Sequence, residues 1–185
     1  MSKKYGYVLA VLISPVFAAD PLDVQDIDLK ADSFRAANTG AMPVTYEDEI
    51  LIHQIGIANY ARSEQFGVIE ANASIRQTGN HNASGTYQAD GVSNLINLTQ
   101  QGDNNFALIS QSGDINSANI NQLNDNNRLT LDQQGANNTA NIDQFGNSSL
   151  IFNQTGDQTA NITLSNTAQG SITQISPTLT LDIQN

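Results

Sequence analysis

Few residues in this chain have the types and spacing needed for catalysis or metal binding. The 185 residues include no cysteine and only two histidines, His53 and His81. Neither histidine has a serine or carboxylate at a spacing typical of a catalytic triad or a metal site. Glu47, Asp48 and Glu49 could act as paired carboxylates, but a run of like charges is usually a solvated linker. We therefore expect no enzyme activity and no bound cofactor.

Three aspartates that follow glycines raise the alternative of calcium sites, because calcium prefers oxygen ligands. They are Asp103, Asp114 and Asp157. The tandem glycine-aspartate nonapeptide that supplies such ligands in β-rolls is missing. We interpret these acids as gatekeepers that slow premature aggregation, and we expect no metal.

Glutamine supplies the main signal, because it recurs at steps of 10 to 12 residues. The gap of 20 residues between Gln154 and Gln174 fits one missing position, which Leu164 occupies, and Gln184 follows ten residues later. Stacked amides at this spacing could hydrogen-bond to one another, as in cross-β assemblies. The predicted ladder comprises Gln54, Gln65, Gln77, Gln88, Gln100, Gln111, Gln122, Gln133, Gln144, Gln154 and Gln174.

A turn pattern, Q-x-G-x-x-N, follows most of these glutamines. Glycine adopts backbone angles that side chains forbid, and asparagine tolerates left-handed angles. Gln122 departs from the pattern with Asn124 in place of glycine, and Glu70, Ser149 and Thr159 take the asparagine place after three other glutamines. The predicted turn residues are Gly56, Asn59, Gly79, Asn82, Gly102, Asn105, Gly113, Asn116, Asn127, Gly135 and Asn138.

Between the turns lie short segments of alternating polarity, such as Ala107-Leu-Ile109-Ser-Gln111. Period-2 alternation indicates strands, with the first, third and fifth residues facing inward. Two strands and two turns make about 22 residues, which is one coil of a two-sided β-solenoid. The sequence thus predicts an all-β, amyloid-forming solenoid of about six such coils over residues 50–185, after a disordered N-terminal segment. Its first strand, residues 50–54, and its last, residues 178–184, lack a cap, which favours polymerisation.

The N-terminus predicts export. Lys3 and Lys4, a short apolar run and small residues up to Ala18 or Ala19 are typical of a signal peptide, which we place at residues 1–18. Residues 19–49 are acidic and interrupted by Pro21 and Pro43, so we expect disorder there. The net charge of −11 argues against nucleic acid as a partner.

The glutamine and turn patterns, over roughly residues 54–174, resemble curlin repeats. The resemblance implies an extracellular functional amyloid on a bacterial surface, which supports biofilm and adhesion. It also implies that residues 19–49 direct the chain to an outer-membrane secretion channel with its accessory proteins, and that the partners are this chain itself and a second curli subunit. The Ala-x-Ile-x-Gln strands and the irregular final repeat favour the minor, nucleating subunit, whereas the acidic charge favours the major one.

A second class of protein, a monomeric β-solenoid that binds a ligand on a flat face, remains an alternative. The predicted outward positions are mixed: Ser110, Asn121, Asp132, Asp143, Asn153 and Thr163. They form no uniform binding array. Arg62, Arg76 and Arg128 are too few for a heparin or nucleic-acid patch.

Overall fold

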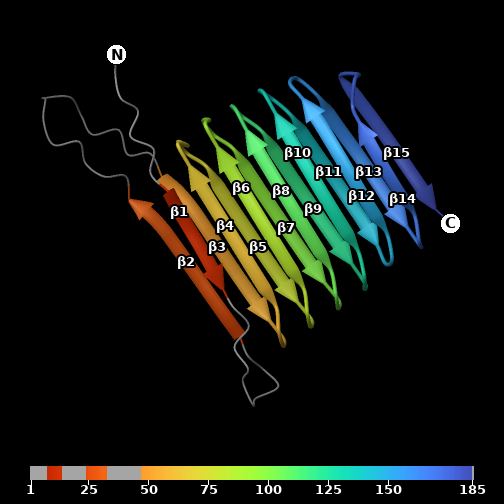
Figure 1. Ribbon diagram of the computed structural model, residues 1–185, viewed down its shortest axis with the longest axis horizontal. Helices are drawn as coiled ribbons and strands as arrows, with labels where there is room; N and C mark the ends of the chain where they lie inside the picture. The colour runs from red at the N-terminus through yellow and green to blue at the C-terminus, as the bar shows by residue number, and fades with distance from the viewer. Residues whose placement is uncertain (1–7, 14–23, 33–46, 185) are drawn as a thin grey trace, which may run out of the picture.

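The chain folds into two facing β-sheets that wind as a single solenoid (Figure 1). The structure is a computed structural model and describes residues 8–13, 24–32 and 47–184. In that part of the chain no helix long and apolar enough to span a membrane occurs. The strands are β1 (Val8–Ile13), β2 (Val24–Asp32), β3 (Glu47–Ile55), β4 (Tyr60–Phe66), β5 (Asn72–Thr78), β6 (Ala83–Ala89), β7 (Leu95–Gln101), β8 (Phe106–Ser112), β9 (Ser117–Leu123), β10 (Arg128–Gln134), β11 (Thr139–Phe145), β12 (Ser149–Thr155), β13 (Thr159–Ser165), β14 (Gln169–Thr173) and β15 (Thr178–Gln184).

From β3 onward, successive strands alternate between the two sheets. Sheet A has the order β1-β4-β6-β8-β10-β12-β14, and sheet B has the order β15-β13-β11-β9-β7-β5-β3-β2. Neighbouring strands within the coils are parallel and in register, so that Gln111 pairs with Gln133 and Ile120 pairs with Ile142. One strand in each sheet and the two corners between them make one coil, with a spacing near 22 residues. The predicted all-β solenoid is confirmed.

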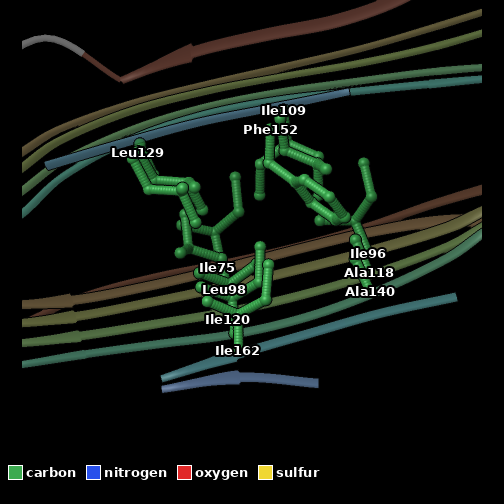
Figure 2. Close-up of a cluster of buried hydrophobic side chains, with 14 of the residues drawn as sticks. Ile75, Ile96, Leu98, Ile109, Ala118, Ile120, Leu129, Ala140, Phe152 and Ile162 are labelled. Atoms are coloured by element: carbon green, nitrogen blue, oxygen red, sulfur yellow. The ribbon is translucent and has the colours of Figure 1, made fainter. Parts of the chain in front are cut away.

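The core lies between the sheets because every second residue of a strand points inward. Ala107, Ile109 and Gln111 are buried, whereas Leu108 between them is 45% exposed. In Figure 2, Ile75, Leu98 and other inward residues of sheet B face those of sheet A, among them Phe152. Small and large apolar residues therefore stack in columns along the solenoid axis.

Both sheets carry an extra strand at their N-terminal edge. β1 pairs antiparallel with β4, and β2 pairs antiparallel with β3 over nine residues, from Val24 opposite Ile55 to Asp32 opposite Glu47. The expectation that the strand at residues 50–54 begins an uncovered edge is therefore wrong, and β3 itself begins earlier, at Glu47. At the other end, β14 and β15 have no further strand beside them in the described residues.

The predicted signal peptide, residues 1–18, and the predicted targeting segment, residues 19–49, lie mostly outside the described residues. Only β1, β2 and the start of β3 belong to them. Both assignments remain predictions.

Candidate functional site

The most regular feature of the interior is a ladder of buried glutamine amides in sheet A. The Gln111 Nε2 donates to the Gln133 Oε1 at 2.8 Å, and the Gln133 Nε2 donates to the Gln154 Oε1 at 2.8 Å. The same contact joins every neighbouring pair in the series, at 2.8 to 3.0 Å. The series is Gln65, Gln88, Gln111, Gln133, Gln154 and Gln174, and each side chain is less than 5% exposed.

A second ladder runs through sheet B and ends sooner. It joins Gln54, Gln77, Gln100, Gln122 and Gln144, each donating to the next. The next two positions are apolar, because Leu164 pairs with Gln144 and Ile183 pairs with Leu164. Gln184, which the sequence spacing placed in the series, is instead an exposed residue opposite Ser165.

The glutamines also join the two sheets. A side-chain amide has two N–H donors, and the Gln111 Nε2 uses its second one on the Leu95 carbonyl of sheet B, at 2.9 Å. The Gln122 Nε2 of sheet B does the same with the Phe106 carbonyl of sheet A, at 2.9 Å. Because buried amides are costly without partners, this geometry explains how so polar a core is stable.

Buried asparagines form a comparable ladder in the corners that lead from sheet B to sheet A. The Asn59 Oδ1 accepts from the Asn82 backbone N–H at 3.0 Å, and the Asn82 Nδ2 donates to the Gly102 carbonyl at 2.8 Å. Asn105 and Asn127 continue the series, and Ser148 ends it by donating to the Asn127 Oδ1. The asparagines thus bond the neighbouring coil.

The left-handed position in these corners differs from the prediction. It belongs to the residue before the asparagine, for example Ala58, His81 and Asn104, with φ of 57°, 57° and 60°. The asparagine itself points inward. Its side-chain amide hydrogen-bonds to the neighbouring coil. Asparagine is therefore required at this position for hydrogen bonding and not for its backbone conformation.

The opposite corners, from sheet A to sheet B, contain a shorter ladder of Asn94, Asn116 and Asn138. The turn pattern missed Asn94 because its corner has one more residue. In three other corners the buried position also departs from the fixed offset. It is Ala71, one residue later than Glu70, and Ser148 and Gln158, one residue earlier than Ser149 and Thr159. Sequence spacing alone does not locate the residue that faces inward when the corner changes length.

The predicted turn glycines lie where successive coils come close together. A Cβ at Gly56, Gly79, Gly102 or Gly113 would lie 2.0 to 2.4 Å from a carbonyl oxygen of the next coil, and all four have positive φ. Gly135 also has positive φ, but its nearest contacts are 3.4 Å away, at Gly156. Four of these five positions therefore exclude any side chain.

The three aspartates considered as calcium ligands accept hydrogen bonds from N–H groups of the preceding coil. The Asp103 Oδ1 accepts from the Asn80 N–H at 2.7 Å, and the Asp114 Oδ1 accepts from the Val92 N–H at 3.0 Å. The Asp157 Oδ1 accepts from the Asn137 Nδ2 at 3.0 Å. No group of three or more His, Cys, Asp or Glu residues suited to a metal ion occurs in the residues that the structure describes.

One outward row on sheet B was not found from the sequence. Asn97, Asn119, Asn141 and Asn161 lie in register, and each side-chain nitrogen donates to the next Oδ1 at 2.9 to 3.0 Å. The outward positions considered as a binding array were those directly before the glutamines, such as Asn121, whereas this row lies two residues earlier in each strand. Asn97, Asn119 and Asn141 thus each use one amide N–H within the row.

The fold and its ladders define a class of protein: a β-solenoid stabilised by stacked amides. A family model described as the curlin associated repeat matches residues 91–123. This segment includes β7, β8 and β9 with Gln100, Gln111 and Gln122. Searches of curated proteins and of solved structures give no match. Residues 91–123 are therefore similar to a curlin associated repeat, and the resemblance predicted from the glutamine spacing is confirmed there.

Proposed function

We propose that this protein is a structural subunit of an extracellular, curli-type amyloid fibre in which copies stack end to end. One observation carries the proposal: the amide ladder of sheet A continues through every coil from Gln65 to Gln174, where β14 lies uncovered. An uncovered strand offers unpaired backbone groups to another chain. Since each coil repeats the one before it, a second copy extends the same stack.

Fibre assembly tests this function directly. The chain, purified in denaturant and transferred to buffer, is expected to form fibres that bind an amyloid dye and diffract at a strand spacing of about 4.8 Å. A stable β-rich monomer that never assembles would contradict the proposal. That result would instead support the ligand-binding solenoid.

The ligand-binding solenoid is the second class of function, and the outer face of sheet B gives it little support. The row of Asn97, Asn119, Asn141 and Asn161 is uniform, but its amide donors bond to neighbouring members of the row. A ligand would have to compete with these bonds. The row resembles another ladder along the axis more than a free binding surface.

Within the fibre, the proposed role is that of the minor subunit, which nucleates growth at the cell surface. Strands of the type Ala118-x-Ile120-x-Gln122 support this role, as does the end of the sheet B ladder at Leu164 and Ile183. The charge of −11 supports the major subunit instead. Seeds of this protein are expected to remove the lag phase of the partner curlin, and fibre labelling is expected only at the cell surface; labelling along whole fibres would identify the major subunit.

The same proposal includes the route to the surface. Residues 1–18 would act as the signal peptide, and residues 19–49 would direct the chain to an outer-membrane channel with its accessory proteins. Support comes from the sequence of these segments and from the curlin associated repeat. Deletion of residues 19–49 is expected to retain the chain inside a curli-producing cell, as measured by fractionation.

A further inference from the structure

A buried oxygen at the N-terminal edge of sheet A has no hydrogen-bond partner. It is the Oε1 of Gln65, whose side chain is 2% exposed. In every later glutamine of this ladder, the Oε1 accepts from the glutamine one coil before it. Gln65 is the first member, so the donor that its position requires is missing. A buried acceptor without a partner destabilises the folded chain.

The strand beside Gln65 does not supply this donor. β1 pairs with β4, and the register places Leu9 opposite Gln65. Leucine has no side-chain donor. β1 also lies within the predicted signal peptide, whose removal would uncover β4.

The C-terminal edge of sheet A ends with the complementary group. Gln174 accepts from the Gln154 Nε2 at 3.0 Å, and its own Nε2 donates to the Thr159 carbonyl at 3.0 Å and to the Ser176 carbonyl at 2.7 Å. No further glutamine follows it in the ladder. At this end of the sheet the N–H that earlier members give to the next glutamine bonds the Ser176 carbonyl of the same chain, and at the other end the Gln65 acceptor is unused.

We propose that β14 of one copy adds to β4 of a second copy in parallel, with Gln174 exchanging its bond to the Ser176 carbonyl for one to the Gln65 Oε1 of that copy. This proposal rests on the proposed fibre function. It adds the register in which β14 of one copy pairs with β4 of the next. Extending the in-register pairing places Thr173 beside Glu64, because Thr173 pairs with Asn153 one coil earlier and Glu64 pairs with Tyr87 one coil later. The glutamine ladder then runs through the junction.

Cysteine cross-linking tests the register, because the chain has no cysteine of its own. Copies of the exported chain with Glu64→Cys are mixed with copies carrying Thr173→Cys, assembled and oxidised. Parallel neighbours lie about 4.8 Å apart, which suits a disulfide. We expect a cross-linked dimer in fibres and none in denaturant.

The matched control shifts one cysteine by two residues, to Arg62→Cys with Thr173→Cys. Equal cross-linking of this pair, or fibres in which the Glu64→Cys and Thr173→Cys copies never cross-link, would overturn the junction while leaving the fibre function intact. Failure of all copies to form fibres would overturn the fibre function and the junction with it.

Sheet B differs from sheet A in the strand at its N-terminal edge. β2 covers this edge, and the sequence of β2 read backwards has the pattern of a solenoid strand. The register places Gln25 opposite Gln54, Ile27 opposite Ile52 and Leu29 opposite Ile50. Read backwards, Leu29-Asp-Ile27-Asp-Gln25 is similar to the inward pattern of strands such as Leu129-Thr-Leu131-Asp-Gln133. The antiparallel direction is what makes this match possible.

From this register we infer a second function: β2 competes with β15 of another copy for the edge of β3. Each junction between two copies needs one free β3 edge. A chain whose β2 stays in place cannot accept β15 of another copy at its own β3, although its own β15 can still join a copy whose β3 edge is free. β2 thus delays assembly, and its release permits growth. This inference also rests on the proposed fibre function.

A disulfide between β2 and β3 tests the competition. Asp28 and Leu51 are opposite each other, so Asp28→Cys with Leu51→Cys is expected to form an intramolecular bridge on oxidation. The oxidised chain is expected to assemble with a lag phase several-fold longer than the reduced chain, and each single variant is expected to be insensitive to reductant.

An independent variant weakens β2 without a bridge. Ile27→Asp is expected to shorten the lag phase several-fold, whereas Asp26→Ser, at an adjacent position, is expected to leave it unchanged. Equal lag phases for the oxidised and reduced double variant would overturn the competition, while fibres of the reduced chain would still support the fibre function. Absence of fibres from the reduced and unmodified chains would overturn both.

Discussion

Gln111 and Gln133 lie one above the other in sheet A, and both are fully buried while the Gln111 Nε2 donates to the Gln133 Oε1 at 2.8 Å. Gln133 in turn donates to the Gln154 Oε1 at 2.8 Å and to the Ser117 carbonyl at 3.0 Å. One side chain thus satisfies three buried groups. Its removal takes one hydrogen-bond partner from each of the three.

Gln133→Ala is therefore expected to reduce the free energy of unfolding by about 3 kcal/mol, since each unpaired buried polar group costs about 1–3 kcal/mol. Denaturant unfolding of the unassembled chain measures this loss. The fibre lag phase is expected to lengthen, because templating needs the same amide.

Thr130→Ala is the matched control on the same strand. Thr130 lies on the outer face of sheet A and pairs with Leu108 and Ile151 in the neighbouring coils. Its truncation is expected to change the free energy of unfolding by about 0.5 kcal/mol or less. Equal losses from the two substitutions would show that the inward amides have no special importance.

The corner glycines give a second prediction, in which a steric clash is separated from backbone strain. Gly79 has a φ of +115°, and a Cβ there would lie 2.1 Å from the Gly102 carbonyl oxygen. Gly79→Ala is expected to prevent normal stacking of its coil and to cost more than about 3 kcal/mol. Loss of β-structure on circular dichroism, or a lower thermal midpoint, measures the effect.

Gly156→Ala is the control for this change. Gly156 has a φ of +69°, but the nearest atom to an added Cβ is the Ala136 oxygen at 4.0 Å. Gly156→Ala is expected to lower the free energy of unfolding by about 1–2 kcal/mol, because only the left-handed backbone conformation is strained there. If Gly79→Ala costs no more than Gly156→Ala, close approach of the coils is not the reason for glycine at Gly79.

Much of the fold was predictable because local spacing determines it. Alternation in Ala107-Leu-Ile109-Ser-Gln111 identifies the inward residues, and all three are buried. The glutamine repeat gives the coil length, because one glutamine per strand is enough to count strands. Register then follows, since stacked amides bond only when they are level.

The corners were less predictable, because their length varies from coil to coil. Asn94 lies six residues after Gln88, whereas Asn116 lies five residues after Gln111. Both are buried at equivalent corners of successive coils, and the Asn116 N–H donates to the Asn94 Oδ1 at 2.9 Å. A pattern with fixed offsets finds only the second.

The N-terminal edge was not predicted because β2 matches the solenoid only in reverse. Gln25, Ile27 and Leu29 have the spacing of inward residues, but a search for repeats in the forward direction passes over them. The residues of β2 alone do not specify that this strand pairs antiparallel with β3.

Ile115 gives a third prediction, because it is a β-branched residue in the left-handed region, with a φ of +57°. Its equivalents in other coils include Ser93 and Asn137. Asparagine tolerates this conformation, whereas a branched Cβ is strained in it. Since Ile115 is 57% exposed, its replacement loses little buried area.

Ile115→Asn is thus expected to raise the free energy of unfolding by about 1 kcal/mol, as measured by denaturant unfolding. Ile115→Val keeps the branched Cβ and is expected to give no gain. A loss of stability in Ile115→Asn would mean that the exposed isoleucine makes a favourable contact that outweighs the strain.

Asp48 gives a prediction about pH. It lies on β3, where burial raises the pKa of its carboxyl above the ordinary 3.8, although its Oδ1 accepts from the Ala71 N–H at 2.9 Å. The folded state then holds a proton at a pH where the unfolded state has lost it. The stability from this proton is present below pH 3.8 and is lost as the pH rises through the raised pKa.

Asp48→Asn removes this proton equilibrium while keeping an oxygen that can accept from the Ala71 N–H. Relative to this variant, the unmodified chain is expected to gain stability as the pH falls from 7 towards 3.8. Denaturant unfolding at a series of pH values measures the difference between the two proteins. A constant difference across the series would show that Asp48 has the same pKa in the folded and unfolded states, and a difference of opposite slope would show that the backbone hydrogen bonds outweigh burial.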